Sequence, residues 1–106
     1  MKYCCVLTTV PTIFKARQLA GLLISQKSAA CVQILPGIES HYHWKGKKET
    51  SKEVLLIIKT SASLYKALEK AILKYHPYEV PEIVCLPITQ GSKSYLDWIA
   101  REVNAR

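Results

Sequence analysis

The sequence predicts a single α+β domain, and three observations support this prediction. The chain of 106 residues has room for one hydrophobic core. Its apolar residues follow two periods in turn, one of two residues as in strands and one of about 3.6 residues as in helices. These segments follow one another in the order β-α-β-β-α-β, with a last helical segment behind them. We therefore treat residues 1–106 as one domain.

The first two elements are a strand and a helix. Residues 2–10 are rich in side chains that favour strands and end at Pro11, which suits a buried strand. Residues 12–28 place apolar side chains, Ala16 and Leu23 among them, at helical spacing along one face.

A long hairpin is expected next. Residues 31–46 and 52–60 both have strand-like patterns and are separated by the turn sequence KGKKE. Pro36 and Gly37 interrupt the first of these strands, as expected of a bulge or kink.

The second half of the chain repeats the helix and the strand. Residues 61–75 form a helical stripe, with Ser61 as its expected cap, and the histidine-proline pair that follows should end it. Residues 80–90 read as a strand and residues 92–104 as a closing helix. This order is the ferredoxin-like plan, in which helices cover one face of an antiparallel sheet.

The other face of that sheet is expected to be apolar as well. In the strand at 52–60, Leu55 and Ile57 point to one side, and Leu56 and Ile58 point to the other. Helices cover only one side of a two-layer domain, so a partner chain is the simplest cover for the open side.

Composition limits the compartment and the partners. No apolar run approaches the roughly 20 residues of a membrane helix, and no signal-peptide pattern is visible, so we expect a cytoplasmic protein without a membrane partner. The four cysteines form no C-x-x-C pair and lie in strand-like runs, as buried reduced thiols would. The net charge of +7 fits either a basic soluble surface or attraction to polyanions.

Several functions that occur on this plan lack their motifs here. RNA-recognition domains need stacking aromatics on the third strand, and KEVLLIIKT has none, so we expect no nucleic-acid partner. Acyl-phosphate hydrolysis needs a glycine-rich anion loop after the first strand, but TTVPTIFKAR contains no glycine.

The segment HPYEVPE presents polar groups in a stiff frame. Pro77 and Pro81 restrict the backbone on both sides of Tyr78. His76 adds a titrating imidazole and Glu82 a carboxylate, so the segment is either a rigid binding loop or a connector. His41 and His43 share one face of the hairpin and could bind a metal, but a solvated face is the simpler interpretation.

The motifs CVQILPGIESHYHWKGK, LIIKT, HPYEVPEIVCLPI and GSKSYLDWI together resemble the CutA family, the divalent-cation tolerance proteins. The resemblance spans almost the whole chain. It implies a ferredoxin-like fold with a long hairpin and an added C-terminal helix, assembled as a homotrimer. It also implies a protein without established enzymatic activity.

The resemblance further implies a ligand-binding cleft between subunits, formed by Cys31, Trp44, Lys59, Tyr78 and Glu82. His76 is the metal ligand that it implies. Copper-linked members carry a cysteine where this chain has Thr8, and a further histidine where it has Tyr75. These two differences remove a soft thiolate and an imidazole, so we expect His76 to bind copper only weakly.

Two functional hypotheses follow. The first is a non-enzymatic trimer for binding or signalling, whose partners are its own copies and a metal ion such as copper, or a small molecule. The second is an enzyme or sensor for a small metabolite in the inter-subunit cleft, with His76 as acid–base and Lys59 as anion partner.

Overall fold

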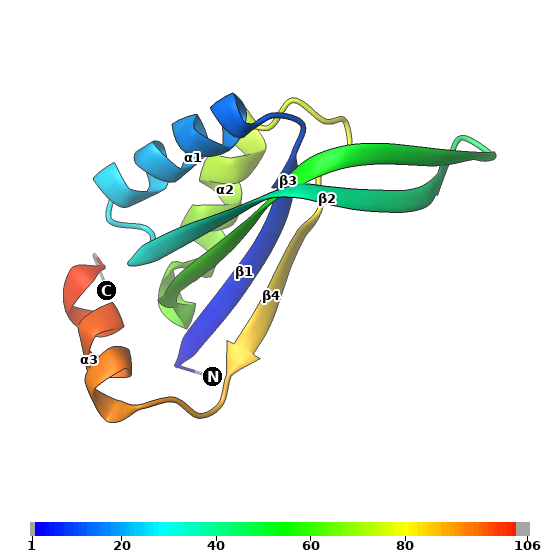
Figure 1. Ribbon diagram of the computed structural model, residues 1–106. Helices are drawn as coiled ribbons and strands as arrows, with labels where there is room; N and C mark the ends of the chain where they lie inside the picture. Colours follow the sequence, from blue (N-terminus) through cyan, green and yellow to red (C-terminus); the bar gives the residue numbers. More distant parts are fainter. Residues whose placement is uncertain (1, 104–106) are drawn as a thin grey trace.

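The computed structural model describes residues 2–103, which fold into an antiparallel four-stranded sheet with two helices on one face (Figure 1). The strand order is β2-β3-β1-β4, as the ferredoxin-like plan requires. The elements are β1 (Tyr3–Val10), α1 (Ile13–Ser25), β2 (Cys31–Trp44), β3 (Lys47–Ser61), a 3-10 turn (Ala62–Leu64), α2 (Tyr65–Tyr75), β4 (Ile83–Ile88) and α3 (Lys93–Glu102). The predicted α+β class and element order are therefore confirmed.

The hairpin of β2 and β3 is longer than the sequence predicted, and it projects well beyond the sheet (Figure 1). Its turn contains only Lys45 and Gly46, whose φ angles are 51° and 80°. Positive φ at both central residues is the tight hairpin turn that matches strand twist. Pairing therefore resumes at once, between Trp44 and Lys47, where a five-residue turn was expected.

A register shift between Leu35 and Ile38 confirms the predicted kink in β2. Gly37 lies at its centre with a φ of 79°, a value that favours glycine over other residues. The bulge adds twist to the hairpin and so allows its outer half to leave the plane of the sheet.

The helices differ from prediction mainly at their ends. Ser61 does not cap α2: it remains in β3, paired with Tyr3, and the 3-10 turn separates it from the helix. His76 ends α2 as predicted, with an extended ψ of 133° ahead of Pro77. The predicted helix at 92–104 begins at Lys93, and residue 104 lies outside the described part of the chain.

The main core lies between the sheet and helices α1 and α2. Alternate residues of the two central strands, including Val6 and Ile58, are fully buried against helical residues such as Leu23, Leu68 and Ile72. Burial of each large aliphatic side chain contributes about 1.5–3 kcal/mol. None of the described helices has both the length and the apolar character needed to cross a membrane.

The opposite face of the sheet is apolar, as predicted. Leu55 and Ile57 are half-buried there. Leu35 of β2 and Val84 and Leu86 of β4 lie on the same face in the strand register and are 50%, 43% and 48% exposed. An apolar sheet face that remains exposed is typical of a surface that contacts a partner.

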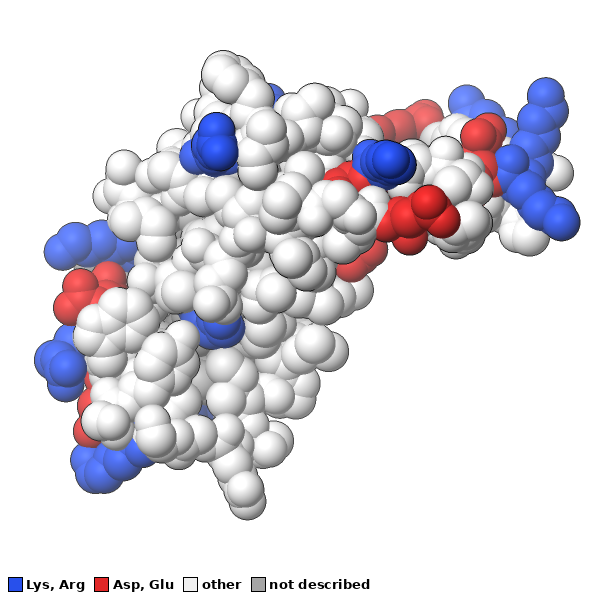
Figure 2. Space-filling model, viewed as in Figure 1, with Lys and Arg blue, Asp and Glu red and all other residues white. Residues whose placement is uncertain are grey.

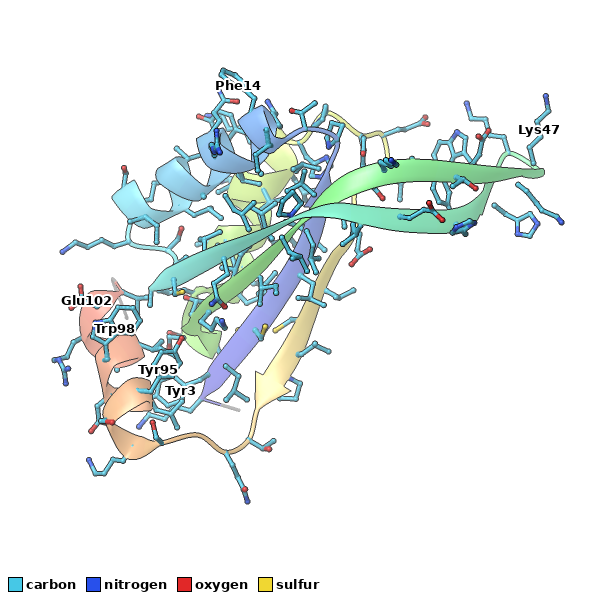
Figure 3. The ribbon with its side chains drawn as sticks, in the orientation of Figure 1. Tyr3, Phe14, Lys47, Tyr95, Trp98 and Glu102 are labelled. Carbon is cyan, nitrogen blue, oxygen red and sulfur yellow. The ribbon has the colours of Figure 1, made fainter. Side chains whose placement is uncertain are left out.

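Helix α3 covers one end of this open face, which the sequence analysis did not predict. Burial and the nearby Cys31 raise the pKa of Tyr95 on α3, and Cys31 shares the open face with Tyr3 and Cys5. Tyr3 is only 7% exposed, and Ile99 is fully buried. Figure 3 shows α3 with Tyr95 beside Tyr3 at this end of the sheet. The remaining open face lies nearer the hairpin.

Candidate functional site

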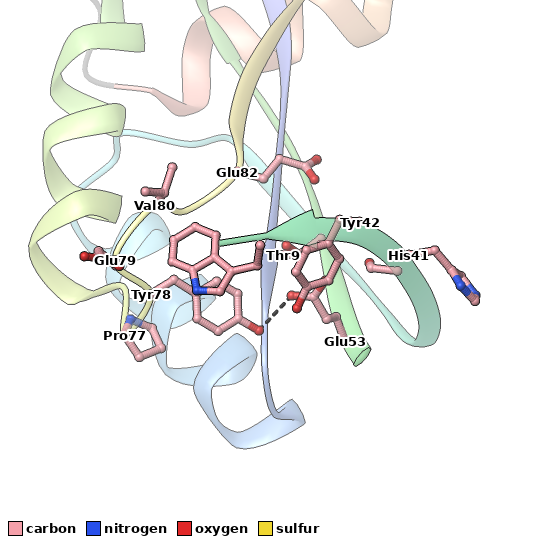
Figure 4. Close-up of a pocket in the computed structure, with 11 residues that line it drawn as sticks. Thr9, His41, Tyr42, Glu53, Pro77, Tyr78, Glu79, Val80 and Glu82 are labelled. Atoms are coloured by element: carbon pink, nitrogen blue, oxygen red, sulfur yellow. Dashed lines mark hydrogen bonds between the residues drawn. The ribbon is translucent and has the colours of Figure 1, made fainter. Parts of the chain in front are cut away.

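A cleft of about 660 Å³ lies where the hairpin leaves the sheet, between the hairpin and the loop that follows α2 (Figure 4). We call it the hairpin cleft. Its walls combine aromatic and acidic side chains: Tyr42, Trp44, Tyr78, Glu53, Glu79 and Glu82. β2 contributes the first two aromatic residues, β3 contributes Glu53, and the loop contributes the rest.

His76 fixes the loop to the end of β1. Its Nδ1 accepts a hydrogen bond from the Tyr78 backbone N–H at 3.1 Å, so Nε2 carries the proton and donates to the Thr9 carbonyl at 2.6 Å. Burial lowers the pKa of His76 and outweighs the opposite effects of Thr9 and Glu53. The imidazole is therefore neutral, and both of its nitrogens form hydrogen bonds that hold the loop in place.

Tyr78 connects the same loop to β3. Its hydroxyl donates a 2.7 Å hydrogen bond to Glu53 Oε2, and its ring lies 4.8 Å from the His76 ring. Burial, with the neighbouring Glu53 carboxylate, raises the pKa of Tyr78 well above its usual value. Its hydroxyl therefore remains a neutral donor at all ordinary pH values.

Glu53 provides a buried carboxylate on the wall of the cleft. It is only 7% exposed. Within residues 2–103, no side chain of lysine, arginine or histidine forms an ion pair with it. Figure 4 shows the Glu53 carboxylate between Tyr78 and Tyr42. A buried carboxylate without a counter-charge is costly, so such groups usually serve a site.

The sequence-predicted site residues fall into two groups. Trp44, Tyr78 and Glu82 line the hairpin cleft. Cys31 and Lys59 do not: they pair with each other near the α3 end of the sheet, where Lys59 donates a hydrogen bond to Gln33. Lys59 is six residues from Glu53 along β3, about 20 Å at the usual rise of a strand. A single chain therefore does not bring the five residues together.

The predicted metal ligands also differ in their surroundings. Coordination by His76 would require one of its two hydrogen bonds to break. Thr8 is fully buried, and its hydroxyl has no hydrogen-bond partner among residues 2–103. His41 contacts Glu39 at 2.7 Å and Thr50 at 3.2 Å on the exposed hairpin. Residues 2–103 contain no group of three or more histidine, cysteine or acidic side chains placed to hold a metal ion.

Glu53 and Thr9 were missed in the sequence analysis. Glu53 precedes an apolar run and has no motif around it, and its partner Tyr78 is 25 residues further along the chain. The available signal was the alternation of β3, which places Glu53 on the same side as Leu55 and Ile57, the open face.

The fold and the cleft define a small ferredoxin-like protein with a binding cleft at the base of an extended hairpin. The CutA1 divalent ion tolerance protein family matches residues 4–102. The chain belongs to this family. The family and fold expected from the sequence are therefore confirmed.

Named relatives agree with this assignment. Over 94 residues, the chain is 51% identical to "Protein CutA 1, chloroplastic" of Oryza sativa, covering 89% of this chain and 53% of that protein. It is 45% identical to "Divalent-cation tolerance protein CutA" of Thermus thermophilus, covering 89% and 91%. The chain thus spans about half the length of the plant relatives and nearly all of the bacterial one.

Solved structures give the same result. CutA1 from Oryza sativa superimposes with a TM-score of 0.95 at 46% identity, covering 98% of this chain and 95% of that one. The protein from Thermus thermophilus gives a TM-score of 0.93 at 41% identity, covering 96% and 99%.

Proposed function

We propose that this protein is a homotrimeric binding or signalling protein of the divalent-cation tolerance type, without catalytic turnover. Its ligand binds in the hairpin cleft. The observation that carries this proposal is the buried Glu53 carboxylate, held by Tyr78 in an aromatic cleft without a basic partner among the described residues. The names of the relatives support the link to divalent cations, and we propose copper as one of them.

The absence of turnover is supported by the state of the polar groups in the cleft. A general acid or base needs an exchangeable position that faces the substrate. Both nitrogens of His76 are engaged with the backbone, and Tyr78 is held as a neutral donor. These groups stabilise the wall of the cleft, and neither His76 nor Tyr78 is free to exchange a proton with a ligand.

The trimer is supported by the open face. Leu35 on β2 and Val84 and Leu86 on β4 are about half exposed, and both β2 and β4 are edge strands. Contact with further copies would bury this apolar surface and protect the edges.

The alternative function, a small-metabolite enzyme or sensor, requires His76 and Lys59 in one site. Within one chain they lie near opposite ends of the sheet. That function therefore requires Lys59 of a neighbouring copy to enter the cleft.

Light scattering tests the assembly: we expect three times the chain mass of 12.0 kDa. Leu86→Glu should dissociate the trimer, because the new charge would lie in a buried interface. Ile24→Glu on α1 is the matched control, since Ile24 is 44% exposed on the helical side, and it should leave the mass unchanged. A monomer in the natural protein contradicts the proposal, as does turnover that His76→Gln abolishes in a metabolite screen.

A further inference from the structure

The hairpin cleft has a composition that contrasts with the rest of the molecule. The chain has a net charge of +7, yet the described residues that line this cleft include three carboxylates and no lysine or arginine. Figure 2 shows acidic side chains near the base of the hairpin and basic ones at its tip. The acidic concentration in a basic protein indicates a site that selects positive charge.

We propose that the hairpin cleft binds an organic cation, an ammonium or guanidinium group, among the aromatic rings of Tyr42, Trp44 and Tyr78 with Glu53 as its counter-ion. This inference rests on the proposed function, in that it assigns a ligand class to the same cleft.

The aromatic residues supply the first part of the recognition. The face of an aromatic ring is negative and attracts a cation within about 6 Å of its centre, most strongly at tryptophan. Tyr42 and Trp44 remain 45% and 38% exposed at the cleft, and the Lys45 ammonium lies 5.7 Å from the centre of the Trp44 ring, so this ring already contacts a cation of the chain itself. Rigid rings that remain open in this way provide contact area at little cost in side-chain entropy.

Glu53 supplies the second part. One of its oxygens accepts a hydrogen bond from Tyr78, and this bond fixes the direction of the carboxylate. The other acceptor positions remain available to a donor in the cleft. An ammonium or guanidinium group donates hydrogen bonds and carries the missing charge, so it offsets the desolvation of a carboxylate that is 7% exposed.

The geometry favours an organic cation over a bare metal ion. Divalent ions need several converging oxygen, nitrogen or sulfur ligands, and residues 2–103 hold no cluster of three such side chains. A cleft of about 660 Å³ is in the size range of small-molecule sites and far larger than an ion requires.

Isothermal titration of the assembled protein tests the proposal with defined probes: n-butylammonium, n-butylguanidinium and tetramethylammonium, with n-butanol as the neutral match. We expect at least one cation to bind about tenfold or more tightly than n-butanol. Glu53→Gln and Trp44→Ala should each weaken the binding of that cation about tenfold or more. Glu102→Gln, a change of an exposed acid on α3, should leave binding unchanged.

Circular dichroism and light scattering on each variant separate lost binding from lost folding. Equal binding of the cations and n-butanol overturns the proposal, as does binding that Glu53→Gln leaves intact. A titration that stays silent both in the natural protein and in a variant with Lys45, Lys47 and Lys48 replaced by alanine also overturns it.

The two proposals fail separately. If the protein is a trimer that binds only copper or zinc, and Trp44→Ala abolishes this binding, the proposed function stands and the organic-cation proposal is rejected. If the protein is a monomer that binds n-butylguanidinium through Glu53, the proposed trimer is rejected and the proposed ligand class stands.

Discussion

The Tyr78 hydroxyl donates a 2.7 Å hydrogen bond to the Glu53 carboxylate and so joins the loop after α2 to β3, the inner strand of the hairpin. The Thr9 carbonyl anchors the same loop through His76. These two bonds hold the loop against the sheet, and the cleft exists because the loop is fixed there.

Removal of the Tyr78 hydroxyl should destabilise the fold. Tyr78→Phe leaves the buried Glu53 carboxylate without its donor, at a cost of about 1–3 kcal/mol. Urea unfolding at fixed protein concentration measures the difference. Tyr42→Phe is the matched control: its hydroxyl contacts Ser51 at 3.3 Å on the exposed hairpin, so its loss should cost about 0.5 kcal/mol or less. Equal losses of unfolding free energy for the two substitutions would show that the hydrogen bond to Glu53 contributes no more than an exposed one.

The stability of the protein should depend on pH through His76. Burial lowers the pKa of this histidine in the folded state below its ordinary value of 6.5. Between these two pKa values the unfolded chain binds more protons, so the free energy of unfolding falls as the pH drops from above 6.5 toward the folded pKa.

His76→Gln should therefore flatten the pH profile of the unfolding free energy just below pH 6.5, although it lowers stability overall. Chemical unfolding at a series of pH values gives the slope. His43→Gln changes an exposed hairpin histidine and should leave the slope unaltered. An unchanged slope in the His76 variant would contradict the linkage.

Two buried threonines should respond to valine in opposite ways. Both Thr8 and Thr60 are fully buried, but the Thr8 hydroxyl has no partner in the described part of the chain, whereas Thr60 donates to the Ser28 carbonyl at 2.7 Å. Thr8→Val removes an unsatisfied polar group and should stabilise the protein by about 1 kcal/mol. Thr60→Val leaves the carbonyl unpaired and should destabilise it by about 1–3 kcal/mol. Thermal melts that shift in the same direction for both would refute this assignment.

The sequence predicted those parts of the molecule that local periodicity determines. Alternation in the strand at 52–60 and helical spacing at 12–28 gave the elements, and the order of elements gave the sheet topology. Pro36 and Gly37 located the bulge because their backbone limits are intrinsic.

The features that the sequence did not predict depend on contacts between residues that are distant along the chain. The bond from Tyr78 to Glu53 follows from the register of β3 against a loop, and Tyr95 reaches Cys31 only because α3 folds back over the sheet. Motif matching grouped Lys59 with Tyr78, although the strand separates them. Spacing in sequence does not determine such distances.

Copper binding should depend little on His76. Its two nitrogens already bond to Thr9 and to the Tyr78 N–H, so a metal would have to displace one of them without a thiolate to assist. In isothermal titration at neutral pH, His76→Ala should therefore change the copper affinity by about 1 kcal/mol or less. The exposed pair on the hairpin is the matched comparison, because His41 and His43 follow each other at i and i+2 on one strand face. Tight binding that disappears with His76→Ala would show that the imidazole exchanges its backbone bonds for the metal. Tight binding that disappears only when both hairpin histidines are replaced would place the copper on the hairpin instead.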